Sequence, residues 1–196
     1  MTLTELFDLD ESSGYSLAGS FTPDLVFSKL WLIRELARIQ PRIGTMYILG
    51  SWYGNLSLLL DRYPRVQVDH VINVEPNDKF VTGSQRILHH AGVDNVEHMQ
   101  ANANSIDYRQ LGRHGAVVNT SLTDMKGQDW FTNIPTGTIV ALQARDHDPG
   151  RQFAGPKDIQ RSFPVSQVLY SGALELKDPQ TQYQRFMIIE IGRAHV

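Results

Sequence analysis

The sequence predicts an α/β fold with a mostly parallel sheet, helices on both faces and an antiparallel hairpin at the C-terminal end. Short Val- and Ile-rich segments alternate with segments of helical spacing along most of the 196 residues. From about residue 166 this alternation stops, and two strand-like segments follow each other across a short polar turn. Strands separated by helices pair in parallel, whereas strands joined by a turn pair in antiparallel fashion.

The elements follow in order along the chain. Thr22 is a candidate cap and Pro23 occupies a favoured first position, so a helix is expected from there until Pro41. Further helices are expected at 55–62, 78–90 and about 129–134. Strands are expected at 46–49, 68–75, 96–101, 116–121, 136–144, 166–176 and 183–191, seven in all, with "KDPQTQ" as the hairpin turn.

Composition and net charge exclude several classes of function. The net charge of −3 provides no broad basic field for a phosphate backbone, so a small-molecule substrate is favoured and nucleic acid is not. The chain has no cysteine, which excludes thiolate catalysis and Cys-ligated metal sites. Its N-terminal region is acidic, and no apolar run has the length of a membrane span, so we expect a cytoplasmic protein. We expect a leader or lid at 1–22 and a single domain at 23–196; the oligomeric state is open, with a homodimer as one arrangement.

The first candidate site is the segment "GSWYG", which follows the first predicted strand. It has only Gly50 and Gly54 as glycines, and Ser51, Trp52 and Tyr53 lie between them. The bulky aromatics disfavour a pyrophosphate, but aromatic faces suit a sulfonium cation. A purely structural turn with its aromatics in the core is the alternative.

The second strand ends on Glu75, where a carboxylate can accept hydrogen bonds from both hydroxyls of a ribose. Asn102 and Ala103 follow the third strand and could offer a hydrogen bond and a flat contact to an adenine ring, or form only a polar loop. Asn119 lies at the carboxyl end of the fourth strand, where ligands meet an open α/β sheet.

The fifth strand runs into Arg145, Asp146, His147 and Asp148. Asp146 or His147 could remove a proton from an acceptor, because imidazole titrates near neutrality and a carboxylate can orient it. The spacing matches no known metal motif, so no metal site is expected.

Together these stretches resemble the class I S-adenosylmethionine-dependent methyltransferases. The resemblance spans about Val26 to Ile191 and rests on "LGSWYG", "NVEPN", "ANANS", "VVNTS" and the terminal hairpin. It implies a Rossmann-like fold in which the last strand inserts antiparallel beside the fifth. It also implies S-adenosylmethionine as cofactor, with the following contacts: Gly50, Ser51 and Gly54 at the methionine portion, Glu75 at the ribose, Asn102 and Ala103 near adenine, and Asn119 beside the reacting methyl.

The resemblance implies methyl transfer, and the charge balance favours a small-molecule acceptor. From the residues at the strand ends we expect Asp146 or His147 as base, and Asn119 with Asp124 to position the acceptor. The "VVNTS" stretch differs from the "[DN]PP[YF]" motif of amino-directed nucleic-acid methyltransferases. Two other functions remain open. The same site could release methylthioadenosine as a lyase or cyclase, or the chain could be a non-catalytic cofactor-binding module.

Overall fold

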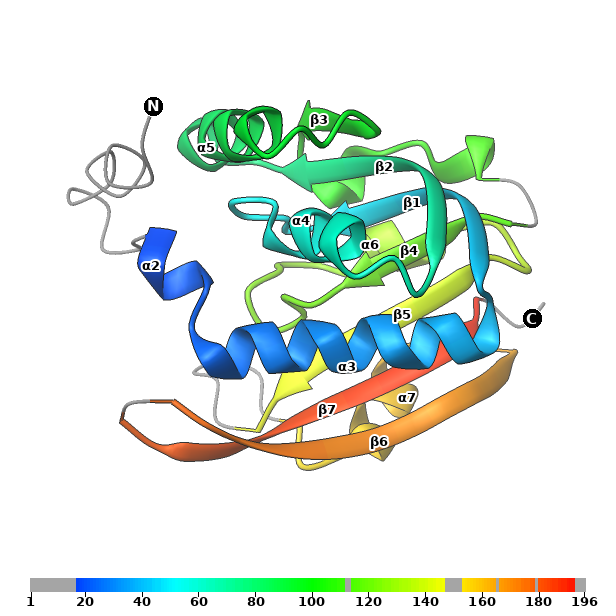
Figure 1. The fold of residues 1–196 in the computed structure, drawn as a ribbon. Helices are drawn as coiled ribbons and strands as arrows, with labels where there is room; N and C mark the ends of the chain where they lie inside the picture. Colours follow the sequence, from blue (N-terminus) through cyan, green and yellow to red (C-terminus); the bar gives the residue numbers. More distant parts are fainter. Residues whose placement is uncertain (1–16, 112–113, 147–152, 165, 179, 193–196) are drawn as a thin grey trace.

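A single seven-stranded mixed sheet forms the centre of the computed structural model, which describes residues 17–111, 114–146, 153–164, 166–178 and 180–192 (Figure 1). Its strand order is β3-β2-β1-β4-β5-β7-β6. The strands are β1 (Arg42–Leu49), β2 (Gln67–Glu75), β3 (Val96–Gln100), β4 (Ala116–Asn119), β5 (Ile139–Arg145), β6 (Gln167–Lys177) and β7 (Gln182–Ile191).

Strand direction follows the expected pattern. The pairs β1–β2, β2–β3, β1–β4 and β4–β5 are parallel. The strand β7 alone runs opposite to the other six strands, and it pairs in antiparallel fashion with both β5 and β6. The predicted insertion of the last strand beside the fifth is therefore confirmed. The chain moves outward from β1 to β3 and then returns to place β4 on the other side of β1, which makes the carboxyl ends of β1 and β4 a topological switch point.

Helices cover both faces of the sheet. Apolar side chains of α3 (Pro23–Ile39) and α4 (Asn55–Arg62) pack on one face, and α5 (Asp78–His90) lies beside α4 (Figure 1). The other face is covered by the short helices η1 (Ala103–Ser105), η2 (Tyr108–Gln110), α6 (Asp129–Thr132) and α7 (Pro156–Ser162). Each face thus has its own apolar core.

The first long helix confirms most of its prediction. It begins at Pro23 and ends at Ile39, before Pro41. The prediction that Thr22 caps this helix is wrong, because the Thr22 side chain makes no capping hydrogen bond. A proline at the first position has no amide N–H to satisfy, so this end has one donor fewer to cap.

The structure also differs from the sequence-based expectation in the length of the first strand and in one helix that was not predicted. The first strand begins at Arg42, before the predicted 46–49, because β1 pairs with β2 from that residue onward. The helix α7 was not predicted, although Gly155 and Pro156 mark its start. Its buried Ile159 packs into the core on the face away from α3.

The described part of the N-terminal segment begins with α2 (Leu17–Ser20). Leu17 packs with Tyr53 and Phe80, and the Asn55 side chain donates a 2.6 Å hydrogen bond to the Ser20 carbonyl. Residues 1–16 of the predicted leader lie outside the described residues. Within the described parts, no helix combines the length and apolarity needed to cross a bilayer.

Candidate active site

Three of the predicted site segments meet at one edge of the sheet. Leu49, which precedes Gly50, pairs in register with Val74 of β2 and with Asn119 of β4. Parallel strands share one carboxyl-end edge, and neighbouring strands lie about 4.8 Å apart. Glu75, the turn after β1 and the end of β4 are therefore adjacent.

The turn after β1 has an unusual backbone. Gly50, Trp52 and Gly54 have φ angles of 62°, 54° and 71°. Left-handed backbone is easily adopted by glycine, but it is uncommon for a bulky residue such as tryptophan. The turn is fixed by two backbone hydrogen bonds, from Ser51 N–H to the Val74 carbonyl at 3.1 Å and from Gly54 N–H to the Ser51 carbonyl at 2.9 Å. Positive φ at three close positions indicates a turn shaped for function.

The same turn leaves a small, polar cradle beside β4. A Cβ atom at Gly50 would lie only 3.1 Å from Cβ of Ser121, so the absence of a side chain at Gly50 lets the two loops approach closely. The hydroxyl of Ser51 is buried and has no hydrogen-bond partner among the described residues. A buried hydroxyl without a partner is costly, and a polar ligand in this cradle would satisfy it.

Glu75 links β2 to the turn. Its Oε2 accepts a hydrogen bond from Trp52 N–H at 3.2 Å, and its Oε1 accepts one from Asn77 N–H at 3.1 Å. Burial raises the pKa of this carboxyl group, while the two backbone N–H groups lower it. An ionised carboxylate has about four acceptor positions, so Glu75 keeps capacity for two further donors.

A polar network that the sequence reading missed lies behind the turn. Ser57 donates to Asn73 at 2.7 Å, Asn73 donates to Ser84 at 3.5 Å, and the Ser84 hydroxyl lies 2.9 Å from Nε2 of His98. Burial lowers the pKa of His98. The network joins α4, β2, α5 and β3 directly under Gly54. The sequence signal that could have revealed this network was a polar residue, Asn73, inside the apolar run of a buried strand.

The aromatic residues of the turn contact one another. The ring of Trp52 lies 5.9 Å from that of Phe80, and the ring of Tyr53 lies 5.1 Å from Phe80, measured between centroids. Tyr53 is buried, and a Cβ on Gly83 would come within 2.8 Å of its ring. The ring of Tyr53 thus packs in the core, whereas Trp52 is half-buried.

Asn102 and Ala103 lie in the loop that follows β3. The Asn102 side chain accepts a hydrogen bond from Asn104 N–H at 3.0 Å and caps η1, whose first residue Ala103 is buried. Asn104 was not predicted as a site residue. Its side chain donates to the Lys126 carbonyl at 2.8 Å and accepts from Trp130 N–H at 3.0 Å, which joins this loop to the one after β4.

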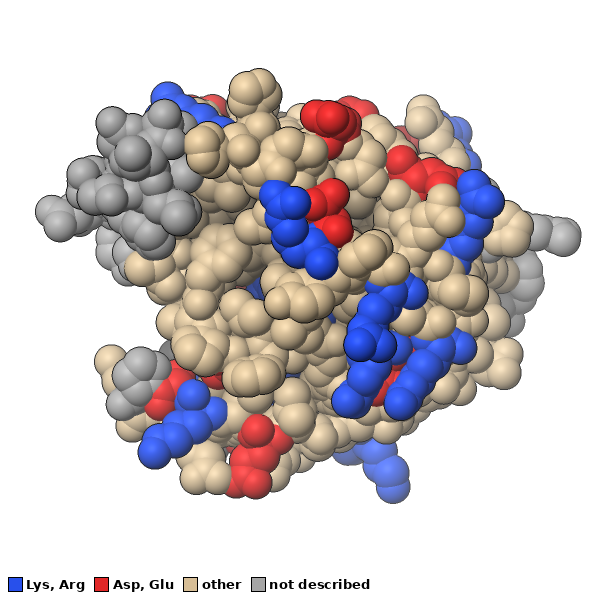
Figure 2. Space-filling view, viewed as in Figure 1, with Lys and Arg blue, Asp and Glu red and all other residues tan. Residues whose placement is uncertain are grey.

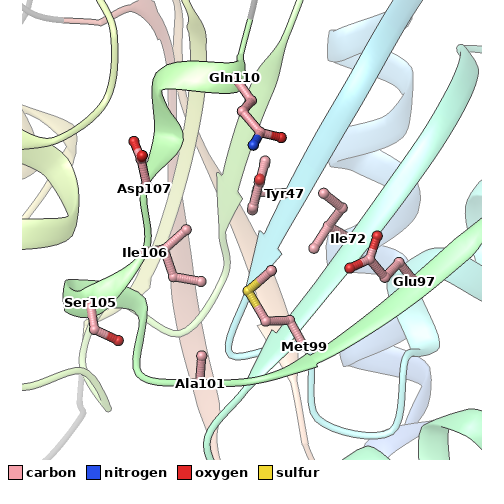
Figure 3. Close-up of a pocket in the computed structure, with 9 residues that line it drawn as sticks. All are labelled: Tyr47, Ile72, Glu97, Met99, Ala101, Ser105, Ile106, Asp107 and Gln110. Carbon is pink, nitrogen blue, oxygen red and sulfur yellow. The ribbon is translucent and has the colours of Figure 1, made fainter.

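A cavity of about 400 Å³ opens next to this loop, on the face of the sheet that carries α6 and α7 (Figure 3). Ala101 and Ser105, on either side of the Asn102–Ala103 pair, line it. Its lining includes four mainly apolar side chains, Tyr47, Ile72, Met99 and Ile106, and two acidic side chains, Glu97 and Asp107. The cavity can accept a flat apolar group.

The side chain of Asn119 is fully buried and is used within its own loop. Its Nδ2 donates to Sδ of Met125 at 3.0 Å, and its Oδ1 accepts from Ser121 N–H at 2.9 Å. Asp124 is exposed in the same loop. Asn119 therefore shapes the loop through side-chain hydrogen bonds, while Asp124 lies at the surface of that loop.

The end of β5 contributes Arg145 and Asp146. Arg145 donates to Asp178 of the hairpin at 2.8 Å and lies 3.8 Å from the centroid of the Tyr183 ring. The backbone N–H of Asp146 donates to the Gln184 carbonyl at 3.1 Å. His147 lies outside the described residues. Within the described ranges, no three acidic or histidine side chains are grouped so that they could hold a metal ion.

The comparisons with known proteins rest on structure. No protein-family model matches the chain, and no curated protein matches it by sequence. Among solved structures, YcgJ of Bacillus subtilis has a TM-score of 0.64 at 12% identity, over 86% of this chain and 100% of that one. The N-terminal domain of EvdMO1, crystallised with S-adenosylhomocysteine (SAH), has a TM-score of 0.58 at 13% identity, over 97% and 95%.

An rRNA methylase from Streptococcus thermophilus is also similar, with a TM-score of 0.56 at 14% identity, over 88% of this chain and 99% of that one. Together with the strand order and the single antiparallel strand β7, these similarities define the architecture. The chain has the fold of the class I S-adenosylmethionine-dependent methyltransferases.

Proposed function

We propose that the chain is an S-adenosylmethionine-dependent methyltransferase that acts on a small molecule. The observation that carries the proposal is the 3.2 Å hydrogen bond from Trp52 N–H to Glu75 at the topological switch point. It holds the carboxylate beside a left-handed turn in which Gly50 allows a close approach to the loop after β4. This arrangement suits a ligand with a ribose at one end and an amino-acid group at the other.

Residues at the carboxyl ends of the strands can be assigned to successive parts of S-adenosylmethionine. Glu75 accepts the ribose hydroxyls with the acceptor capacity that its two backbone contacts leave. The Ser51 hydroxyl and the backbone of Gly50, which carries no side chain, contact the methionine portion. Asn102 and Ala103 lie where the adenine would rest, next to the cavity that Ala101 lines.

S-adenosylmethionine, when bound, supplies an electrophilic methyl group on a sulfonium. The protein then has to align an acceptor with that methyl, and orientation alone provides about 7 to 11 kcal/mol. Asn119 keeps the loop after β4 in place, which makes it a positioning residue in this proposal. Asp146, or His147, takes the proton from an acceptor hydroxyl or protonated amine, and Asp124 at the loop surface orients the acceptor.

The charge distribution supports a small-molecule acceptor. The rRNA methylase among the similar structures acts on RNA by its name, so this fold can serve nucleic acid. On the face shown in Figure 2, however, basic and acidic side chains lie side by side. Arg34 and Arg38 at the surface of α3 both pair with Glu35. A net charge of −3 adds little attraction for a phosphate backbone.

The substitution Glu75→Gln tests the cofactor site. A neutral amide loses charge-assisted hydrogen bonds to the ribose, so S-adenosylmethionine should bind about 10- to 100-fold more weakly in calorimetry. Asp69→Asn is the matched control, because Asp69 is exposed at the opposite end of the same strand. Absence of binding to the wild-type protein, or equal affinity of wild type and Glu75→Gln, would overturn the proposal.

The substitution Asp146→Asn tests the proton acceptor. Loss of a general base lowers turnover by about 10²- to 10⁴-fold, while the cofactor affinity should stay near that of the wild type. The readout is the rate of SAH formation with an acceptor found in a metabolite panel. Asp61→Asn, at the surface of α4, is the control. Unchanged turnover would remove Asp146 from the mechanism.

Incubation with S-adenosylmethionine alone separates methyl transfer from the other two functions. A methyltransferase should leave the cofactor intact until an acceptor is added. Release of methylthioadenosine in the absence of any acceptor would contradict methyl transfer, and so would tight binding without turnover across the panel.

A further inference from the structure

A group of polar and charged side chains lies buried between α3 and the carboxyl end of the sheet, on the side away from Glu75. The α3 residues Asp24, Ser28 and Lys29 belong to it and are all buried. Alternation along β5 and β7 directs Gln143, Arg145, Tyr183 and Arg185 to the same face as α3, because Met187 and Ile189, at matching positions of β7, pack in the core beneath that helix.

Three hydrogen bonds, formed by two pairs of residues, hold α3 over this region. The Ser28 hydroxyl donates to Oε1 of Gln143 at 3.0 Å, and Nε2 of Gln143 donates to the Ser28 carbonyl at 3.2 Å. The Tyr183 hydroxyl donates to Oδ2 of Asp24 at 2.6 Å. The backbone that carries Lys29 is thus held by contacts of Ser28, the residue before it, and of Asp24, in the preceding turn of the helix.

Lys29 is the unusual member of this group. Its side chain is more than nine-tenths buried, yet it makes no hydrogen bond or ion pair within the part of the chain that the structure describes. Lysine is seldom buried unless it is paired, because the loss of hydration disfavours the ammonium ion. Burial and the nearby guanidinium of Arg185 lower the pKa of Lys29 to about 7, and Asp24 offsets this only in part.

The position of this group relative to the cofactor site follows from the sheet. Arg185 donates a hydrogen bond to the carbonyl of Thr120, the residue directly after β4. From β2, which carries Glu75, to β4 is a distance of two strands, and β5 and β7 lie beyond. At about 4.8 Å per strand, a ligand with its ribose at Glu75 directs its other end toward β4, next to Arg185 and Lys29.

We propose that Lys29, with Arg185 beside it, binds an anionic group of the methyl acceptor, either a carboxylate or a phosphate. This inference rests on the proposed function, because it assigns the acceptor class to the same edge of the sheet. An oxyanion would supply the hydrogen-bond acceptors that the buried ammonium lacks, and it would lie between two positive charges. The acceptor is therefore an acidic small molecule.

Binding of an oxyanion should change the titration of Lys29, which gives a readout independent of catalysis. In the wild-type protein with ¹³Cε-labelled lysine, one lysine resonance should titrate near pH 7 and be absent from Lys29→Met. Sulfate and acetate are the probes, because neither titrates near pH 7, and sodium chloride at equal ionic strength is the control. We expect the midpoint to rise by about one pH unit with a bound oxyanion, which corresponds to a tenfold preference for the charged ammonium.

The probes distinguish the two sources of the anion. A response to sulfate indicates a phosphate-bearing acceptor, and a response to acetate indicates a carboxylate; a response to both supports the oxyanion site without separating them. A midpoint that sulfate and acetate leave at its value in chloride overturns the inference. Lys29→Arg serves to assign the resonance should Lys29→Met fail to fold.

Calorimetry keeps this inference separate from the proposed function. Lys29→Met and the exposed control Lys157→Met should both bind SAH as tightly as the wild type does. If the wild type fails to bind SAH, the methyltransferase proposal fails, whatever the behaviour of Lys29. If SAH binds and the Lys29 titration ignores both probes, only the acceptor assignment fails.

Discussion

Replacing Gly54 with alanine should destabilise the protein by about 2 to 4 kcal/mol, which combines a left-handed backbone with overpacking. A Cβ at this position would lie 2.3 Å from Oγ of Ser84, 3.0 Å from Cδ1 of Leu88 and 3.2 Å from Nδ2 of Asn73. Ser84 and Asn73 belong to the buried network beneath the turn and Leu88 is buried in the core, so none of them can move into open space. Thermal denaturation should show a midpoint lower by about 5 to 15 °C.

The chain offers a matched control at Gly92. Gly92 has the same φ of 71°, but a Cβ there would meet nothing within 4 Å. Gly92→Ala should therefore show only the backbone contribution, about 1 to 2 kcal/mol. The double variant Gly54→Ala/Ser84→Ala should recover part of the loss, because it removes the closest contact. Equal destabilisation by Gly54→Ala and Gly92→Ala would disprove the close packing of this turn.

Gly54 also explains why the sequence predicted a turn between the first strand and the next helix. Gly54 is the residue before α4, and Asn55–Arg62 has the bounds that the helical spacing indicates. The alternation of strands with helices is a strong signal because each buried parallel strand needs a run of apolar residues. The terminal hairpin predicted an antiparallel pair, and the resemblance to the methyltransferases implied that the last strand lies beside the fifth; the hairpin turn is stabilised by hydrogen bonds from Gln180 and Thr181 N–H to Asp178.

Local patterns could not predict contacts between distant segments. Asn104 joins two loops, and its importance depends on Lys126 and Trp130 being close in space. Asn119 was expected beside the ligand because it ends β4, but its side chain bonds Met125 and Ser121. Nothing in the spacing of the sequence distinguishes an amide that faces a ligand from one that closes its own loop.

The burial of Lys29, on the face of the sheet covered by α3, was also not predictable from local sequence patterns. On a helical wheel Lys29 is one charged residue in an amphipathic helix, and such residues usually face solvent. Its burial arises because α3 is held over β5 and β7 by Gln143 and Tyr183, which lie far along the sequence. The proposed acceptor site therefore depends on contacts between distant segments, whereas the proposed cofactor site was predicted from residues at the strand ends.

Glu190 should reduce stability as pH rises, and Glu190→Gln should remove this dependence. Its carboxylate is fully buried on β7 between Val140 and Val168, and both oxygens lack a hydrogen-bond partner among the described residues. Burial raises the pKa of Glu190 to about 8, from an ordinary value of 4.5 for a solvated glutamate. The folded state therefore keeps the proton over a pH range in which the unfolded chain has released it.

The sign follows from this difference in proton binding. Below about pH 4.5 both states are protonated and Glu190 costs nothing through ionisation. Between about pH 4.5 and 8 the free energy of unfolding falls with pH by about 1.4 kcal/mol per unit, and above pH 8 the penalty is complete. At pH 7 the penalty is about 3 kcal/mol, which makes Glu190→Gln one of the more stabilising single changes available to the chain.

Urea denaturation of wild type and variant at several pH values between 5 and 8 measures this effect. Glu190→Gln should gain stability relative to the wild type as pH rises, with little difference near pH 5. Glu175→Gln is the matched control, because Glu175 is exposed on the neighbouring strand β6 and the same chemical change there should alter stability by less than about 0.5 kcal/mol at any pH. A gap between Glu190→Gln and wild type that stays constant with pH would show that Glu190 is ionised in the folded protein, held by a partner that the described residues do not include.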